Sequence, residues 1–156
     1  MNASTSDEPA REVTADLQTM GAGLLTELRL FDMVFPEHTN HYGTLLGGRA
    51  LYLMDTAAFM AASRFARHAV VTASSERVEF ERPVREGQLL EVLAQVVGTG
   101  KSSIRVEVRL FAEDLLTGER QLCTHGRFIL VAVDGEGRKT VLFPSSSETS
   151  GSQHDS

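Results

Sequence analysis

Cysteine is nearly absent from this chain of 156 residues, and long apolar runs are absent altogether. The single cysteine, Cys123, can form neither an intramolecular disulfide nor a zinc site built from several cysteines, so a reducing compartment is expected. The apolar runs are too short to span a bilayer, and residues 1–16 carry acids where a secretory signal needs an apolar core. We therefore expect a cytoplasmic protein that does not insert into a membrane.

Basic residues are also in the minority, since 15 lysines and arginines face 21 acidic residues and give a formal net charge of −6. A protein that binds nucleic acid or an anionic membrane needs a positively charged surface. The composition argues against both kinds of partner. Any functional lysine or arginine must therefore act locally.

The length and the 42% hydrophobic content suit one compact core. Both ends of the chain are polar and lack residues that could anchor a core. We expect disordered tails at residues 1–22 and 144–156 and a single domain at residues 23–143. No repeat or linker marks a second domain.

Hydrophobic spacing predicts one long helix and five strands in this domain. The helix is expected at residues 44–67, with Thr44 as its N-cap. The strand at residues 103–112 is the clearest, because apolar and polar side chains alternate along it. The predicted strands span residues 26–34, 70–80, 88–97, 103–112 and 121–133.

These elements predict an α+β fold in which an antiparallel sheet of about five strands wraps around one long central helix. A single helix cannot cover a flat sheet of that width, so the sheet has to curve around it. The other face of the sheet is still partly apolar and would need a partner. A homodimer or a larger assembly is therefore expected.

One acid, Asp55, falls at the centre of the apolar side of the predicted helix, among Leu51, Ala58 and Phe59. The helix's arginines lie on the far side, and no basic residue stands three or four positions from Asp55 to form an ion pair. Burying such a group is costly unless something compensates. Two interpretations stay open: a catalytic carboxylate, or a core aspartate bonded to a strand backbone.

A glycine pair, Gly47 and Gly48, occupies the first turn of the same helix, where glycine is a poor choice for stability. Unpaired N–H groups there could stabilise an oxyanion, and the missing side chains let a carbonyl approach. The alternative is tight packing against a strand. Gly48 and Asp55 lie seven residues apart on one face, and Asn40 and His41 precede them as further candidates.

The segment HTNHYGTLLGGRALYLMDTAA, residues 38–58, resembles the signature of the hot-dog acyl-CoA thioesterases. The matching positions are Asn40, Gly43, Gly47, Gly48 and Asp55. The resemblance continues through Phe80, Pro83, Val84 and Gly87 and covers residues 24–143. It implies a hot-dog fold that hydrolyses acyl-CoA, with Asp55 as general base or nucleophile and Asn40 orienting the water or the carbonyl.

The resemblance also implies that coenzyme A binds along a subunit interface of a dimer or hexamer. The phosphate ligands would come from Lys101, Ser102 and Ser103 in a turn between strands, with Arg82 as a second candidate. No metal or cofactor is implied, because coenzyme A is part of the substrate. Thr44 and Leu46 depart from the commonest pattern of the family, so the acyl-chain preference cannot be inherited from it.

Two other functions remain open for a chain of this kind. A hot-dog dehydratase needs a histidine near the acid, and His41, His68 and His125 are the candidates. A non-catalytic acyl-CoA sensor would keep the pocket but lack the acid, so Asp55 counts against it. The residues alone specify neither the acyl group nor whether Asp55 attacks directly or through water.

Overall fold

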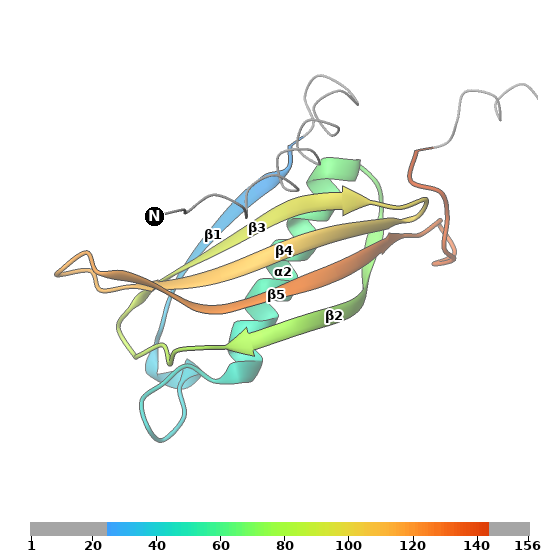
Figure 1. Ribbon diagram of the computed structural model, residues 1–156. Coiled ribbons are helices and arrows are strands. Elements are labelled where there is room, and N and C mark those ends of the chain that lie inside the picture. The colour runs from blue at the N-terminus through green and yellow to red at the C-terminus, as the bar shows by residue number, and fades with distance from the viewer. Residues whose placement is uncertain (1–24, 144–156) are drawn as a thin grey trace, which may run out of the picture.

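The computed structural model describes residues 25–143, and the tails predicted at residues 1–22 and 144–156 lie outside this range (Figure 1). Within it, the predicted long helix and five strands are all present, and the ends of the strands differ from those predicted by no more than two residues. The elements are β1 (Glu27–Met33), the 3-10 turn η1 (Pro36–His38), α2 (Gly47–Ala66), β2 (Val70–Phe80), β3 (Leu89–Thr99), β4 (Ser103–Glu113) and β5 (Arg120–Ala132).

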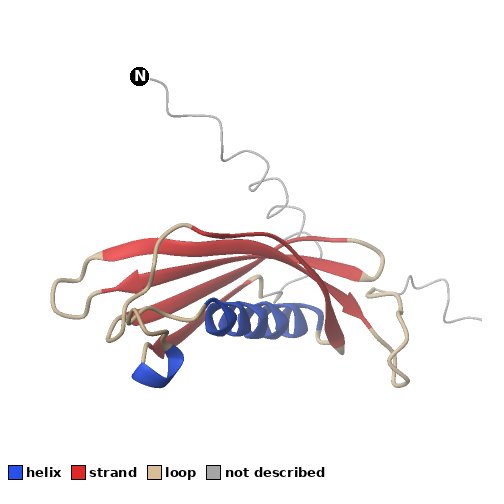
Figure 2. Cartoon of the chain, turned by 90° about the horizontal axis from the view of Figure 1, so that it is seen from below, coloured by secondary structure: helices blue, strands red, loops and turns tan. Residues whose placement is uncertain are grey.

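The five strands form one antiparallel sheet in the order β1-β3-β4-β5-β2. Hairpins join β3 to β4 and β4 to β5, whereas the long helix carries the chain from β1 to the opposite edge, where β2 lies. The sheet curves, and α2 lies along its concave side (Figure 2). This arrangement confirms the predicted α+β hot-dog fold.

The core lies between the concave face of the sheet and one side of α2. The alternation in β4 is confirmed, since Val106 and Val108 are fully buried against the helix. The buried side of α2 is rich in alanine, which lets the helix lie close to the sheet, and Met54 and Phe65 fill the remaining space. Truncating a buried phenylalanine such as Phe65 costs about 3–5 kcal/mol in comparable cores.

The helix begins three residues later than predicted, at Gly47, with Leu46 at the N-cap position and no side-chain cap. The prediction that Thr44 is the N-cap is wrong, because Thr44 pairs with Arg85 and its hydroxyl donates to Asn40. Thr44 therefore belongs to the loop before α2 and caps no helix, so the first turn of α2 keeps unpaired N–H groups. Neither described helix has the length and apolar character needed to cross a bilayer.

Ion pairs cover much of the convex face of the sheet, so this face gives a weaker reason for a partner than expected. Glu91 is buried and pairs with Arg29 and Arg120, while Arg127 pairs with Glu107. The surfaces without partners lie elsewhere. Among the described residues they include the outer edge of β2, where ten of the 11 residues are at least partly exposed, and the adjoining side of α2.

Candidate active site

Asp55 lies at the border between the buried and the exposed sides of α2. The predicted placement at the centre of the apolar side is wrong, because Leu51 and Phe59, one turn away in each direction, are 36% and 44% exposed. The sheet instead contacts the side that contains Ala57 and Ala61. Asp55 is consequently half-buried, with apolar side chains beside it on the exposed surface.

A threonine on β2 holds this carboxylate. The hydroxyl of Thr72 donates to Oδ1 of Asp55 at 2.7 Å. No described residue forms an ion pair with Asp55, and the strand-backbone bond of the core-aspartate interpretation does not occur. The carboxylate is therefore oriented by one bond and keeps its second oxygen for another partner. Thr72 was not predicted, because it follows Asp55 by 17 residues on a different element.

The two glycines at the start of α2 leave an open surface. Neither the Gly47 N–H nor the Gly48 N–H donates to another described residue. A Cβ added to Gly48 would meet nothing within 4 Å, and one added to Gly47 would lie 3.7 Å from the Phe80 ring. The tight-packing alternative therefore fails for Gly48. The helix end presents free donors together with its partial positive charge.

Asn40 shapes the loop in front of these donors. Its Oδ1 accepts hydrogen bonds from the Tyr42 N–H at 2.9 Å and from the Thr44 N–H at 3.2 Å. Because these backbone donors need an oxygen acceptor, the side-chain amide has only one favourable orientation. Its NH₂ group has no hydrogen-bond partner among the described residues. His41 is exposed, and its ring packs on Tyr42 at 3.9 Å between centroids.

Asn40, Gly47 and Gly48 therefore gather at one end of the helix. The loop is tied to that end by the hydrogen bond from the Leu46 N–H to the His38 carbonyl, at 2.9 Å. Asp55 follows Gly48 by about 10 Å along the axis, as the rise of an α-helix requires. Its side chain leans back toward the N-terminal end, as all helical side chains do.

Arg82 joins this end of the molecule. Together with Gly47 it borders a cavity of 290 Å³ beside the start of α2. Its Nη1 donates to Oε1 of Gln121 at 3.3 Å, and the side chain is exposed. A cation at this position is available to an anionic group outside the cavity.

Lys101, Ser102 and Ser103 lie at the other end of the sheet. The Ser102 carbonyl accepts from the Ala132 N–H at 2.7 Å, and Ala132 pairs with Val70, which follows the C-terminal end of α2. The same chain therefore does not bring this turn to Asn40 and Gly48. A role in the site would require a second copy of the chain.

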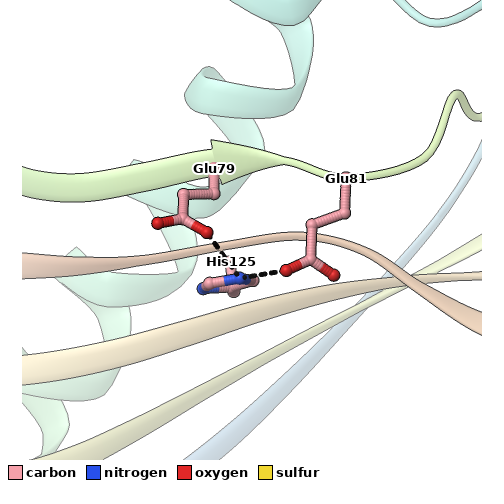
Figure 3. Close-up of side chains that lie close together, drawn as sticks. All are labelled: Glu79, Glu81 and His125. Carbon is pink, nitrogen blue, oxygen red and sulfur yellow. Dashed lines mark hydrogen bonds and ion pairs between the residues drawn. The ribbon is translucent and has the colours of Figure 1, made fainter.

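His125 lies on the opposite face of the sheet from the helix. Its Nε2 is 2.8 Å from Oε1 of Glu81 and 3.6 Å from Oε2 of Glu79 (Figure 3). The preceding residue, Thr124, is buried on the helix side, so alternation along β5 turns His125 outward. His125 of the same chain is therefore not placed to serve Asp55 as the dehydratase alternative requires. These three side chains each offer one metal-ligand atom, and the three atoms lie within 4.8 Å of one another.

Comparison with known proteins agrees with this geometry. The sequence model of the thioesterase superfamily matches residues 42–119, a segment that contains the glycine pair, α2 and Asp55. The chain belongs to the thioesterase superfamily. Its five-stranded sheet around one helix is the fold of the solved acyl-CoA hydrolases, so the protein is a member of the hot-dog acyl-CoA thioesterase family.

Three relatives illustrate the likeness. An uncharacterized acyl-CoA thioester hydrolase of Bacillus subtilis, YkhA, is 36% identical over 105 residues, which are 67% of this chain and 61% of the relative. This chain thus spans less than two thirds of that protein. A Staphylococcus aureus acyl-CoA hydrolase, solved with butyryl coenzyme A, coenzyme A and coenzyme A disulfide, is 32% identical with a TM-score of 0.71, over 75% of this chain and 71% of that one.

The third relative is an apo-hexameric acyl-CoA thioesterase, which is 37% identical with a TM-score of 0.73, over 80% of this chain and 81% of that one. The S. aureus enzyme has also been solved as variants in which a single aspartate, asparagine or threonine is replaced by alanine.

Proposed function

We propose that the protein hydrolyses the thioester of acyl-CoA to a free acid and coenzyme A, with Asp55 as the reacting carboxylate. Water supplies the oxygen of the new C–O bond, the C–S bond breaks, and a proton goes to the sulfur. The observation that carries the proposal is an oriented carboxylate, held by Thr72, on the same helix surface as the free N–H of Gly48.

The spacing of the altered residues in the S. aureus enzyme supports this assignment. In that protein the asparagine precedes the aspartate by 15 positions, and the threonine follows the aspartate by 17. Asn40, Asp55 and Thr72 have the same separations. The hydrogen bond from Thr72 to Asp55 then indicates the role of the threonine, which is to orient the carboxylate.

In the proposed mechanism the thioester carbonyl docks at the start of α2, where the N–H groups of Gly47 and Gly48 point at its oxygen. Negative charge develops on that oxygen in the transition state, and donors already fixed in place stabilise it there. The free NH₂ of Asn40 supplies a further donor to the carbonyl or to the attacking water. No electrons are transferred, so the step needs no redox cofactor, and coenzyme A enters as part of the substrate.

The separation of Gly48 and Asp55 bears on how the carboxylate acts. About 10 Å along the axis leaves room for a carbonyl group and one water between them, if both belong to the same chain. Direct attack would need a carboxylate much nearer to the carbonyl. A second copy of the chain could supply it, and the two arrangements make different predictions for mixed dimers.

We infer a homodimer formed through the outer edge of β2. This strand is 11 residues long, and its outer edge carries unpaired backbone groups, which are a template for pairing with another strand. Two copies paired there would extend the sheet and cover Tyr52 and Phe59, which are 59% and 44% exposed. Three such dimers would form a hexamer like that of the relative.

A dimer of this kind also gives Lys101, Ser102 and Ser103 a route to the substrate. In one chain they lie at the wrong end of the sheet, but a two-fold axis reverses the direction of the partner. The turn would then bind coenzyme A phosphates next to the partner's site, with Arg82 as a second cation.

The test is the substitution Asp55→Asn, which keeps the shape of the side chain and removes its charge. We expect turnover of acyl-CoA, measured as released thiol, to fall by at least about 100-fold, the lower range for loss of a catalytic acid or base. Asp134→Asn makes the same change in the turn after β5, away from the site, and should keep full activity. Wild-type turnover by Asp55→Asn would disprove the assignment.

Mixing two inactive variants then tests whether the site is shared. Suppose that Asp55 of one copy acts with Gly48 of the other. When Asp55→Asn and Gly48→Pro chains exchange subunits at random, about half of the dimers contain one chain of each kind, and one of the two sites in such a dimer is intact. The mixture then regains about a quarter of the sites. If both residues act in the same chain, the mixture stays inactive. Elution as a monomer with full activity would contradict the dimer.

A further inference from the structure

The 290 Å³ cavity beside the start of α2 has a feature that the proposed reaction leaves unused. Its walls include Gly47 and Ala50 from the helix, Phe80 and Val84 from β2 and the segment after it, and Thr124 from β5. Most of these side chains are apolar. The exception deep in the wall is Thr124, which is 2% exposed.

The hydroxyl of Thr124 makes no hydrogen bond with any described residue, unlike that of Thr44, which also borders the cavity and donates to Asn40. In the described part of the chain, the polar side-chain atom that is sealed from solvent without a partner is Nε of Arg49. Because the Thr124 hydroxyl also lacks a partner, it must be accessible to solvent, and the cavity provides this access. A buried hydroxyl without a partner is costly, so one is expected from outside.

The cavity begins where the proposed carbonyl site ends. Gly47 belongs to both, so an acyl group whose carbonyl oxygen meets the Gly47 and Gly48 N–H groups can extend from there into the cavity. A carbon group occupies about as much room as a water molecule, roughly 30 Å³. A chain of fewer than about ten carbons can therefore lie wholly inside it, whereas a longer chain has to project into solvent.

We propose that this cavity is the acyl subsite, and that it selects short acyl chains bearing a hydroxyl or oxo group that hydrogen-bonds to Thr124. The inference rests on the proposed thioesterase function and adds a substrate class to it. A subsite that holds a buried polar group favours the ligand that satisfies this group and disfavours the isosteric ligand that leaves it unpaired.

The test compares kcat/KM for butanoyl-CoA, 3-hydroxybutanoyl-CoA, acetoacetyl-CoA and hexadecanoyl-CoA. We expect one or both of the oxygenated four-carbon substrates to exceed butanoyl-CoA by about fivefold, which corresponds to one neutral hydrogen bond. Hexadecanoyl-CoA should be the poorest substrate. Thr124→Val should bring the ratio of oxygenated substrate to butanoyl-CoA close to one by lowering only the activity on the oxygenated substrate.

A control separates this effect from a loss of folding. Thr124→Val removes no internal hydrogen bond, so its melting temperature should equal or exceed that of the wild type. Thr140→Val makes the same change at the other end of the sheet, where the Thr140 N–H bonds the Ala132 carbonyl. This variant should leave the substrate ratio unchanged.

The outcomes distinguish the two proposals. Hydrolysis of none of the four substrates overturns the thioesterase function and the acyl subsite together. Three other results would overturn the subsite alone and leave the thioesterase function intact. They are equal rates on butanoyl-CoA and both oxygenated substrates, a substrate ratio that Thr124→Val does not change, and a preference for hexadecanoyl-CoA.

Discussion

The hydrogen bond from Thr72 to Asp55 makes Thr72 a positioning residue, and its removal is the most informative single change. A bond of 2.7 Å from a hydroxyl to a carboxylate is short and charge-assisted. Bonds to charged groups contribute about 1.5–3 kcal/mol, and the lower end applies because Asp55 is only half-buried. A loss of about 1.5 kcal/mol corresponds to roughly a tenfold decrease in rate.

The substitution that tests this value is Thr72→Val, which has nearly the same shape and suits a β-strand equally well. We expect kcat on acyl-CoA, followed as thiol release, to fall about tenfold with KM little changed, because the bond orients the carboxylate rather than the substrate. Thr72→Ser keeps the hydroxyl and should restore most of the activity.

Two results would refute this reasoning. Wild-type kcat in Thr72→Val would mean that the bond has no part in the reaction. Equal losses in Thr72→Val and Thr72→Ser, with a parallel decrease in the urea midpoint, would mean that Thr72 only supports the fold.

Three further outcomes are expected. Gly48→Pro should lower kcat by about 100- to 1,000-fold, because proline is tolerated in the first helical turn but removes the N–H donor, while Gly48→Ala should fold and stay within tenfold of wild type. Glu91→Gln should lower the free energy of unfolding in urea by about 1 kcal/mol without changing kcat, since it weakens the pairs that the buried Glu91 makes with the partly exposed Arg29 and Arg120. Desolvation raises the pKa of the Cys123 thiol, so a thiol-reactive dye at about pH 8 should label it only after unfolding, and labelling of the native protein would contradict its burial.

Much of the candidate site was predictable from sequence because its parts are local. Asn40, Gly47, Gly48 and Asp55 lie within 16 consecutive residues. In that stretch a loop leads directly into a helix, and helical geometry alone sets the distance from Gly48 to Asp55. The resemblance to thioesterases rests on the same segment, and the superfamily match overlaps most of it.

Other features depended on contacts between distant segments. Helical spacing predicts Asp55 in the middle of the apolar side, whereas the sheet contacts a neighbouring side and leaves Leu51 and Phe59 exposed. Spacing along a helix shows which residues share a side, but not which side the sheet covers. For the same reason Thr72 was missed, since nothing in its sequence context marks it as a partner of Asp55.

The sequence by itself thus determined the element order, the α+β fold and the run of residues that ends in Asp55, because hydrophobic period and helical spacing are local properties. Only the tertiary structure decided that Thr72 holds the carboxylate, that His125 faces away from it, and that Lys101 lies at the other end of the sheet. These relations follow from how an antiparallel sheet pairs its strands and curves around one helix, and strand register is a long-range property.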